Sequence, residues 1–236
     1  EDTKTVYVGA NDGMLHAFDS ETGVERFAYV SNLLNFSNLA LLSRGDYTHK
    51  WSVDGPQVVT NRKQTLNENW LVGAVGRGGK GLYGLNVTNP NAFSASNVKW
   101  ELAETPKDNM GLVTGRPLLA NVKSGVVAAV LGNGVNSKNN KAVLLVVNVK
   151  TGAVIQELDT GAGDAANPNG LSAPTAILGE DGKSIAYAYA GDRLGNIWKF
   201  DMRDATPSKW TSKKLFSAKA SDGAGAVQPI MGALTV

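Results

Sequence analysis

The sequence repeats one unit, in which two short apolar runs flank a polar turn and a second turn ends in Thr-Gly. The first copy is VYVGANDGMLHAFDSETG, residues 6–23. Residues 6–8 and 14–18 have the length and residue types of strands, and Asn-Asp-Gly at 11–13 has those of a tight turn. Residues 25–30 predict a third strand. A chain built from such units is constrained to form a β-meander.

Related units recur along the chain, at residues 70–87, 126–155 and 186–201. The four units start about 50 to 65 residues apart, which is room for three or four strands and their loops. A blade of a β-propeller has this size and buries its flat faces against its neighbours. The sequence therefore predicts an all-β fold, a modified β-propeller whose repeats resemble those of quinone-binding (PQQ) propellers.

The composition agrees with many short strands, and the chain length limits the number of blades. Of the 236 residues, 42% are hydrophobic and 27 are Gly. We expect residues 1–236 to belong to a single propeller domain. Closed propellers have about four to eight blades, so we expect this set to be incomplete, with the closing blades beyond residue 236. One helix is predicted within residues 33–42, where apolar residues recur at helical spacing.

Charge and cysteine content remove several classes of function. The 23 basic and 21 acidic residues give a net charge of +2, so no nucleic-acid partner is predicted. The absence of Cys excludes disulfides, thiolate metal sites and a Cys nucleophile. No run reaches the roughly 18 apolar residues that a spanning helix needs.

The segments that resemble catalytic motifs do not predict a catalytic site once their neighbouring residues are considered. Residues 76–81, GRGGKG, match the spaced glycines of a dinucleotide loop, but a strand-like LYGLNV follows where a helix is required. We interpret this segment as a hairpin turn. His16 and His49 stand alone, and neither HExxH nor GxSxG occurs. The sequence predicts no catalytic residue, no cofactor and no enzymatic activity.

Two surface segments are candidates for binding. Arg44, Gly45 and Asp46 form the integrin-binding tripeptide, although matches of three residues often arise by chance. They lie in a long insertion, residues 33–50, that we expect to contact partners. Residues 179–183, GEDGK, occupy the place of a possible calcium loop. Their two carboxylates are adjacent rather than alternating, so we favour a plain hairpin.

Several longer segments together carry a family resemblance. They are VDGP at 53–56, NWLVGAVGRGGKGLYGLNVTNP at 69–90, LGNGVNS at 131–137, NGLSAPT at 169–175, AYAGDRLGNIWKFD at 188–201 and QPIMGA at 228–233. In this order they resemble the C-terminal propeller of the PilC/PilY family, the type IV pilus tip-associated biogenesis proteins and adhesins. The match spans nearly the whole chain.

The resemblance implies an exported protein at the pilus tip, the outer membrane or the cell surface, with a periplasmic pool. It implies roles in promoting pilus assembly, countering retraction and adhering to host cells or surfaces. The implied partners are minor pilins or the pilus tip and a host-cell surface receptor, with no small-molecule substrate. Many family members carry an alternating-Asp calcium loop before the AYAGD segment. Its ligand positions fall here on Leu178, Glu180, Gly182 and Ala186, so we expect the loop to be degenerate and the calcium lost.

Two alternatives remain open from the sequence. A quinone-dependent dehydrogenase shares the DxxTG-type turn, but this chain has no Cys for a vicinal disulfide and no evident constellation of carboxylates. A structural envelope propeller, like the lipoprotein of outer-membrane barrel assembly, would also use such repeats. The order of the family segments favours the hypothesis of a type IV pilus protein over both alternatives.

Overall fold

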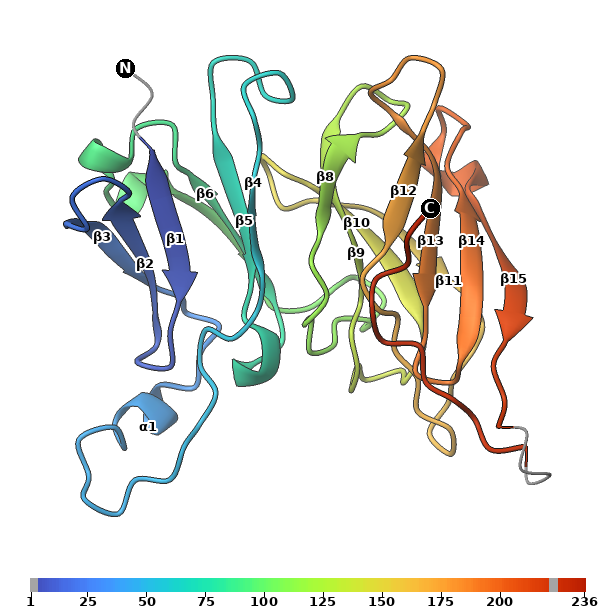
Figure 1. The fold of residues 1–236 in the computed structure, drawn as a ribbon, viewed down its shortest axis with the longest axis horizontal. Helices are drawn as coiled ribbons and strands as arrows, with labels where there is room; N and C mark the ends of the chain where they lie inside the picture. Colours follow the sequence, from blue (N-terminus) through green and yellow to red (C-terminus); the bar gives the residue numbers. More distant parts are fainter. Residues whose placement is uncertain (1–3, 221–224) are drawn as a thin grey trace.

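The computed structural model describes residues 4–220 and 225–236. Within them the chain forms four antiparallel sheets, one for each predicted repeat (Figure 1). In every sheet the spatial order of the strands is their order along the chain, and Figure 1 shows the first and the fourth sheet at opposite ends of the molecule. The predicted all-β propeller is confirmed, and each sheet is one blade.

Within the described residues, the first blade has three strands and the other three have four each. The first blade consists of β1 (Thr5–Gly9), β2 (Met14–Asp19) and β3 (Glu25–Val30). The second consists of β4 (Gln57–Val59), β5 (Trp70–Ala74), β6 (Leu82–Asn86) and β7 (Val98–Leu102). The third consists of β8 (Leu118–Asn121), β9 (Val127–Gly132), β10 (Val143–Asn148) and β11 (Val154–Asp159). The fourth consists of β12 (Thr175–Leu178), β13 (Ile185–Gly191), β14 (Asn196–Asp201) and β15 (Thr211–Ser217).

Helical structure is confined to short segments. The α-helix α1 covers Phe36–Leu39, and 3-10 turns lie at Gly76–Gly78, Pro90–Ala92, Ala95–Asn97 and Pro207–Lys209. The helix predicted within residues 33–42 is present and is a single short turn. Asn35 caps α1, and after Leu39 the backbone makes successive i→i−3 bonds, from Leu42 N to Leu39 O and from Arg44 N to Leu41 O. Such bonds tighten the chain into turns and end the helix. Of the described residues, no helix is both long and apolar enough to cross a membrane.

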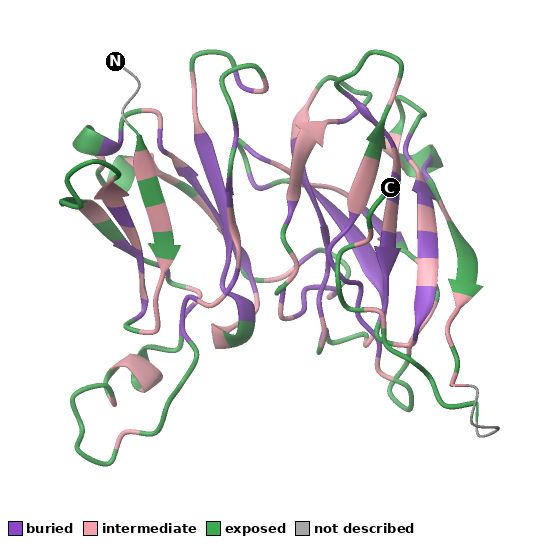
Figure 2. Ribbon diagram, in the orientation of Figure 1, coloured by how far each residue is buried: buried purple, intermediate pink, exposed green. Residues whose placement is uncertain are grey.

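The residue pattern explains why each segment is a strand. In β2, Leu15 and Ala17 are fully buried while Met14, His16 and Phe18 are only half-buried, which is the period of two of a sheet with one covered face. Strand β5 and the first five residues of β10 are apolar and buried on both faces, because a blade lies on each side of them. Figure 2 shows this difference between the first blade and the inner ones.

Apolar side chains fill the space between neighbouring blades. Leu15 of the first blade and Tyr83 of the second belong to one cluster, and Phe27 stacks on Phe93 with ring centroids 3.7 Å apart. Further clusters join the second blade to the third and the third to the fourth, where Phe200 is completely buried. Burying a side chain of this size contributes about 1.5–3 kcal/mol, so no blade is stable without its neighbours.

Outer-strand side chains add specific contacts between blades. Trp100 of β7 lies against Gly152 in the β10–β11 turn and donates its Nε1–H to the carbonyl of Val149, 2.9 Å away. At the equivalent place in β11, Gln156 donates its side-chain amide to the carbonyl of Pro207 in the fourth blade, at 2.9 Å. Each outer strand thus holds the loop between the third and fourth strands of the next blade.

The loops gather at the two ends of the blades. The loops β4–β5, β8–β9 and β12–β13 lie at the upper end in Figure 1. The insertion that carries α1, between β3 and β4, extends from the lower end. These two ends are the surfaces on which loops can act without disturbing the packed blades.

Candidate functional site

The insertion between β3 and β4 is fixed to the propeller at both of its ends. Leu34 and Val53 are buried and pack with Val75 of the second blade. On the return of the chain, the backbone N–H of Ser52 donates to Asn11 Oδ1 at 3.0 Å, and that of Val53 donates to a first-blade carbonyl at 3.2 Å. The insertion therefore has rigid ends and an exposed middle (Figure 2).

The Arg-Gly-Asp tripeptide lies in that exposed middle. Arg44 donates Nε–H and Nη2–H to the two carboxylate oxygens of Asp46, each at 2.9 Å, and the two side chains are 58% and 71% exposed. No heavy atom lies within 4 Å of a Cβ built on Gly45. The two charges neutralise each other, so a receptor that reads them separately must first break the pair. Exposed pairs contribute about 0–1 kcal/mol, which makes this a small barrier.

An aromatic and cationic cluster marks the base of the insertion. Trp51 is 42% exposed, with the ring of His49 edge-on at 4.7 Å and the guanidinium of Arg77 over its face at 5.0 Å. Arg77 belongs to the Gly-rich segment between β5 and β6, where a 3-10 turn replaces the helix that a dinucleotide site needs. The interpretation of residues 76–81 as a hairpin turn is confirmed.

The second predicted segment is the turn between β12 and β13. Asp181 Oδ1 accepts the backbone N–H groups of Lys183 at 2.9 Å and Ser184 at 2.8 Å, and these bonds lower the pKa of Asp181 to about 2. Gly182 has a φ of 62°, which a residue with a side chain adopts only with strain. The Lys123 ammonium lies 3.8 Å from the other Asp181 oxygen. These contacts build a hairpin that needs no ion.

The family's calcium does not fit the residues of this turn. Of the four expected positions, Leu178 and Ala186 have apolar side chains, Gly182 has none, and only Glu180 offers a carboxylate. Calcium takes six to eight oxygen ligands, and Asp181 already uses one of its oxygens in the turn. Among the described residues no group of three or more His, Cys, Asp or Glu could hold a metal. The loss of calcium binding at this turn stays a prediction.

Each histidine has structural neighbours. His16 Nδ1 lies 2.6 Å from Glu25 Oε1 and its Nε2 lies 2.9 Å from Asp12 Oδ2, so a carboxylate engages each ring nitrogen. The bond to Glu25, together with that to Asp12, raises the pKa of His16 against the opposing effect of burial. His49 packs on Trp51 in the insertion. The structure places the two in separate clusters.

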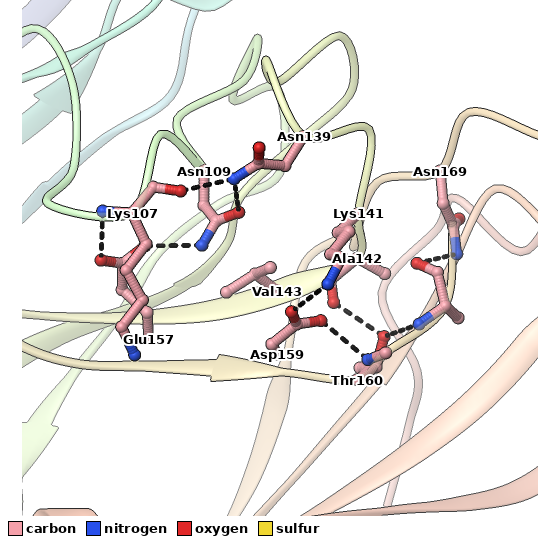
Figure 3. Close-up of polar contacts among 12 residues, drawn as sticks. Lys107, Asn109, Asn139, Lys141, Ala142, Val143, Glu157, Asp159, Thr160 and Asn169 are labelled. Atoms are coloured by element: carbon pink, nitrogen blue, oxygen red, sulfur yellow. Dashed lines mark hydrogen bonds and ion pairs between the residues drawn. The ribbon is translucent and has the colours of Figure 1, made fainter. Parts of the chain in front are cut away.

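Sequence reasoning missed a buried polar network between the second and third blades (Figure 3). Glu157 of β11 is 6% exposed and accepts three hydrogen bonds, from Thr105 Oγ1 at 2.9 Å, Lys107 N at 3.1 Å and Asn109 Nδ2 at 2.8 Å. Asn139 extends the network by donating to the carbonyl of Lys107 at 2.5 Å. The donors all follow the outer strand of one blade and the acceptor lies on the next, so this carboxylate joins the blades.

A second buried carboxylate orders the centre of the fourth blade. Asp192 is fully buried and accepts from Asn196 N at 2.8 Å, Trp198 Nε1 at 2.8 Å and Asn169 Nδ2 at 3.0 Å. The spacing D-x3-N-x-W within GDRLGNIW is the sequence signal that could have found it. Both oxygens are occupied by donors from the chain itself, so the arrangement positions strands and has no lone pair directed to a ligand.

With this geometry described, comparison with known proteins decides the family. The sequence model of the PilY1 β-propeller domain matches residues 1–236. The chain belongs to the PilY1 β-propeller family. A type IV pilus biogenesis factor PilY1 homolog of Xylella fastidiosa is 38% identical over 98% of this chain, and PilY1 of Pseudomonas aeruginosa PAO1 is 39% identical over 84%. The chain spans 17% of the length of each of these relatives.

Solved structures agree with the PilY1 assignment. The C-terminal domain of Pseudomonas aeruginosa PilY1 superposes with a TM-score of 0.77 at 32% identity, covering 97% of this chain and 48% of that one. A quinohemoprotein alcohol dehydrogenase of Pseudomonas putida covers 97% of this chain with a TM-score of 0.52 but only 15% identity, and 36% of its own length is matched. The dehydrogenase shows a shared fold alone, whereas the PilY1 relatives are named as biogenesis factors.

Proposed function

We propose that this chain is a non-catalytic part of a type IV pilus biogenesis factor that is exported to the cell envelope. The observation that supports this proposal is that the chain belongs to the PilY1 propeller family over its full length. The relatives are named as biogenesis factors, and the chain corresponds to a fraction of them. The packed blades supply a rigid support on which loops at either end meet other pilus components.

Within this proposal the insertion between β3 and β4 is the part that meets a partner. Its ends are held by buried apolar packing, so contact by its middle leaves the blades intact. Phe36 is 53% exposed, Leu42 39% and Trp51 42%, and exposed large apolar side chains are the ones that gain most from being covered. Pilus-tip components, including minor pilins, are the proposed partners, with assembly or resistance to retraction as the outcome.

Adherence to host cells is the finer part of the proposal and rests on the tripeptide. The Arg44–Asp46 pair is exposed on a protruding segment, and the small cost of opening it permits a surface receptor to engage both charges. Location at the pilus tip, the outer membrane or the cell surface would follow from this role.

We also include in the proposal that these four blades are part of a larger propeller. The solved PilY1 domain is about twice as long as this chain, which covers 48% of it. Ile230 N donates at 3.0 Å to the carbonyl of Asp192, which follows β13. One blade earlier, Leu171, which leads into β12, bridges to Gly134, which follows β9. Residues near 230 therefore have the position of a segment that leads into a further blade.

A genetic experiment tests the proposal. The propeller is deleted in a retraction-competent strain and in a retraction-deficient one, and surface pili and adherent cells are counted in both. Pili that are lost in the first strain and restored in the second support a role in assembly or against retraction. Unchanged pilus numbers and adherence in both strains would contradict the proposal.

Point variants separate the two roles. Arg44→Ala with Asp46→Ala removes the exposed pair without touching the anchored ends of the insertion. Replacement of the exposed pair Lys213→Ala and Lys214→Ala on β15 is the matched control. If adherence falls only in the tripeptide variant while pili are retained, receptor contact is supported. If both variants adhere as well as the unaltered protein, the insertion acts in assembly alone.

A further inference from the structure

Three hollows lie along the first strands of the blades. Their volumes are about 690, 400 and 380 Å³. Val59 is shared by the first and second, Asn61 and Lys63 by the first and third, and Gln64 and Leu119 by the second and third. Because they share lining residues, the three hollows are adjacent, and we call them together the axial mouth. The β4–β5 and β12–β13 loops, which contribute Lys63 and Lys183 to it, lie at the opposite end of the blades from the insertion (Figure 1).

The lining of the axial mouth is mainly cationic. Lys63, Arg116 and Lys183 are among its residues, and no Asp or Glu is among the described residues that line the three hollows. A neighbouring hollow, which shares Leu178 with the third, adds Lys123, Arg203 and one carboxylate, Glu180. The whole chain has 23 basic and 21 acidic residues, so this excess of cations is a local concentration of charge. A concave surface of one sign focuses its field and attracts anions.

Two of these cations are set in place by the same local structure. Asn61 Oδ1 accepts the backbone N–H of Lys63 at 3.0 Å, and Asp181 Oδ1 accepts that of Lys183 at 2.9 Å. Each lysine thus follows an Asx turn at the tip of a first-to-second-strand loop. Asp181 is the carboxylate closest in sequence to Lys183, and its other oxygen lies 3.8 Å from the ammonium of Lys123. The two lysine side chains are exposed.

The side-chain amide of Gln64 holds the lining of the axial mouth in place. Gln64 Nε2 donates to the carbonyl of Leu119 on β8 at 2.6 Å, and its Oε1 accepts the N–H of Asn61 at 3.0 Å. The loop of the second blade is therefore tied to the third blade. A surface that is ordered before binding loses less entropy when a ligand arrives.

The backbone that lines the mouth includes strand edges. β4, β8 and β12 are the first strands of their sheets, and each pairs with a neighbouring strand on one side only. On β8 the other edge is partly used, because the carbonyl of Leu119 accepts Gln64 Nε2 and Asn121 bridges to Ser184. The other edge of β4 offers N–H and C=O groups to an extended chain. Tyr7 is the only aromatic residue among the described residues that line the hollows, so stacking of sugar rings has little support here.

We propose that the axial mouth binds an extended, acidic peptide segment of a protein partner. Carboxylates of the segment meet Lys63, Lys183 and Arg116, and its backbone meets the open edge of β4. This site is separate from the insertion and its tripeptide, so it goes beyond the proposed function and gives the propeller a second contact at its other end.

The test measures binding of a fluorescein-labelled peptide of alternating Glu and Ser to the purified full-length protein by fluorescence polarisation. Lys63→Glu with Lys183→Glu reverses two charges of the mouth. Lys213→Glu with Lys214→Glu makes the same change of net charge on β15, outside the three hollows. We expect the first pair to weaken binding about tenfold or more and the control pair to leave it nearly unchanged.

Several results would overturn the proposal. They are the absence of saturable binding to the unaltered protein, an equal loss in both variants, and preferential binding of dextran sulfate, which would make the site one for polysaccharides. Thermal unfolding checks that each variant is folded. If the charge reversal unfolds the protein, Lys63→Ala with Lys183→Ala replaces it, because truncating exposed side chains leaves both Asx turns intact. Unchanged affinity in that variant would likewise reject the site.

Discussion

Two glycines in equivalent turns allow the docking of Trp100 to be measured. Gly23 and Gly152 each end a Thr-Gly turn, with φ of 72° and 71°. Each donates its N–H at 2.9 Å to the carbonyl four residues earlier. A Cβ on Gly23 would meet nothing within 4 Å, whereas one on Gly152 would lie 2.7 Å from Cγ and Cδ2 of Trp100. Gly23→Ala and Gly152→Ala therefore make the same change to the backbone, and only Gly152→Ala also disturbs the ring of Trp100.

The expected magnitudes follow from these contacts. Ala in the left-handed region costs about 1–2 kcal/mol, and the lower entropy of the unfolded chain returns about 0.4–1 kcal/mol, so Gly23→Ala should lose about 1 kcal/mol. Gly152→Ala bears the same change and also displaces the indole. Overpacking costs about 1–3 kcal/mol and loss of the Trp100–Val149 bond about 1 kcal/mol. Its total should be about 3 kcal/mol or more.

Urea unfolding followed by tryptophan fluorescence gives the free energy of unfolding of both variants, and an unchanged m value shows that they are comparable. A difference of about 2 kcal/mol between them is the stabilisation due to docking. If the two variants agree within about 0.5 kcal/mol, the contact between Trp100 and the next blade does not hold the blades together, and the reasoning is refuted.

Three further predictions concern single side chains. Glu157→Ala leaves three donors without an acceptor, two of them on buried side chains, so it should lower the free energy of unfolding in urea by about 3 kcal/mol. A loss below about 1 kcal/mol would mean that water replaces the carboxylate. His16 has a folded-state pKa raised above its ordinary 6.5, so its stabilisation is complete below the unfolded pKa and is lost as pH rises through the folded one. The Tm advantage of the natural protein over His16→Gln should thus be larger at acidic than at alkaline pH, and a constant advantage would contradict this. Glu180→Ala should leave the calcium affinity of the protein, measured by calorimetry, unchanged, and a loss of affinity would show that the β12–β13 turn binds the ion.

Strands next to strong turns could be predicted from the sequence. Residues 6–8, 14–18 and 25–30 were expected as strands and lie within β1, β2 and β3. Their alternation and the Asn-Asp-Gly turn are local signals that need no other part of the chain. The short first strands β4, β8 and β12 have three or four residues each, too few for a period to appear. They exist because the second strand of each blade pairs with them.

The binding segments were located by the sequence but not described by it. The insertion around Arg44 was expected to be exposed, and it is, yet the pairing of Arg44 with Asp46 depends on a turn that no pattern announced. The axial mouth has no motif at all. Lys63 and Lys183 lie 120 positions apart in the numbering and line one hollow only because two blades place their loops at the same end.

The sequence by itself determined the repeat, the all-β class and the family, because turns, alternation and the order of segments are written locally. Tertiary structure decided which polar groups are buried and which charges gather. Glu157 looks like a surface residue in the sequence, but it lies among donors that follow the outer strand of the preceding blade, 48 to 52 positions earlier in the chain. Asp192 has near donors in Asn196 and Trp198, yet Asn169, 23 positions earlier, also has to reach it. Burial and electric field are sums over neighbours in space, and the sequence shows only the neighbours along the chain.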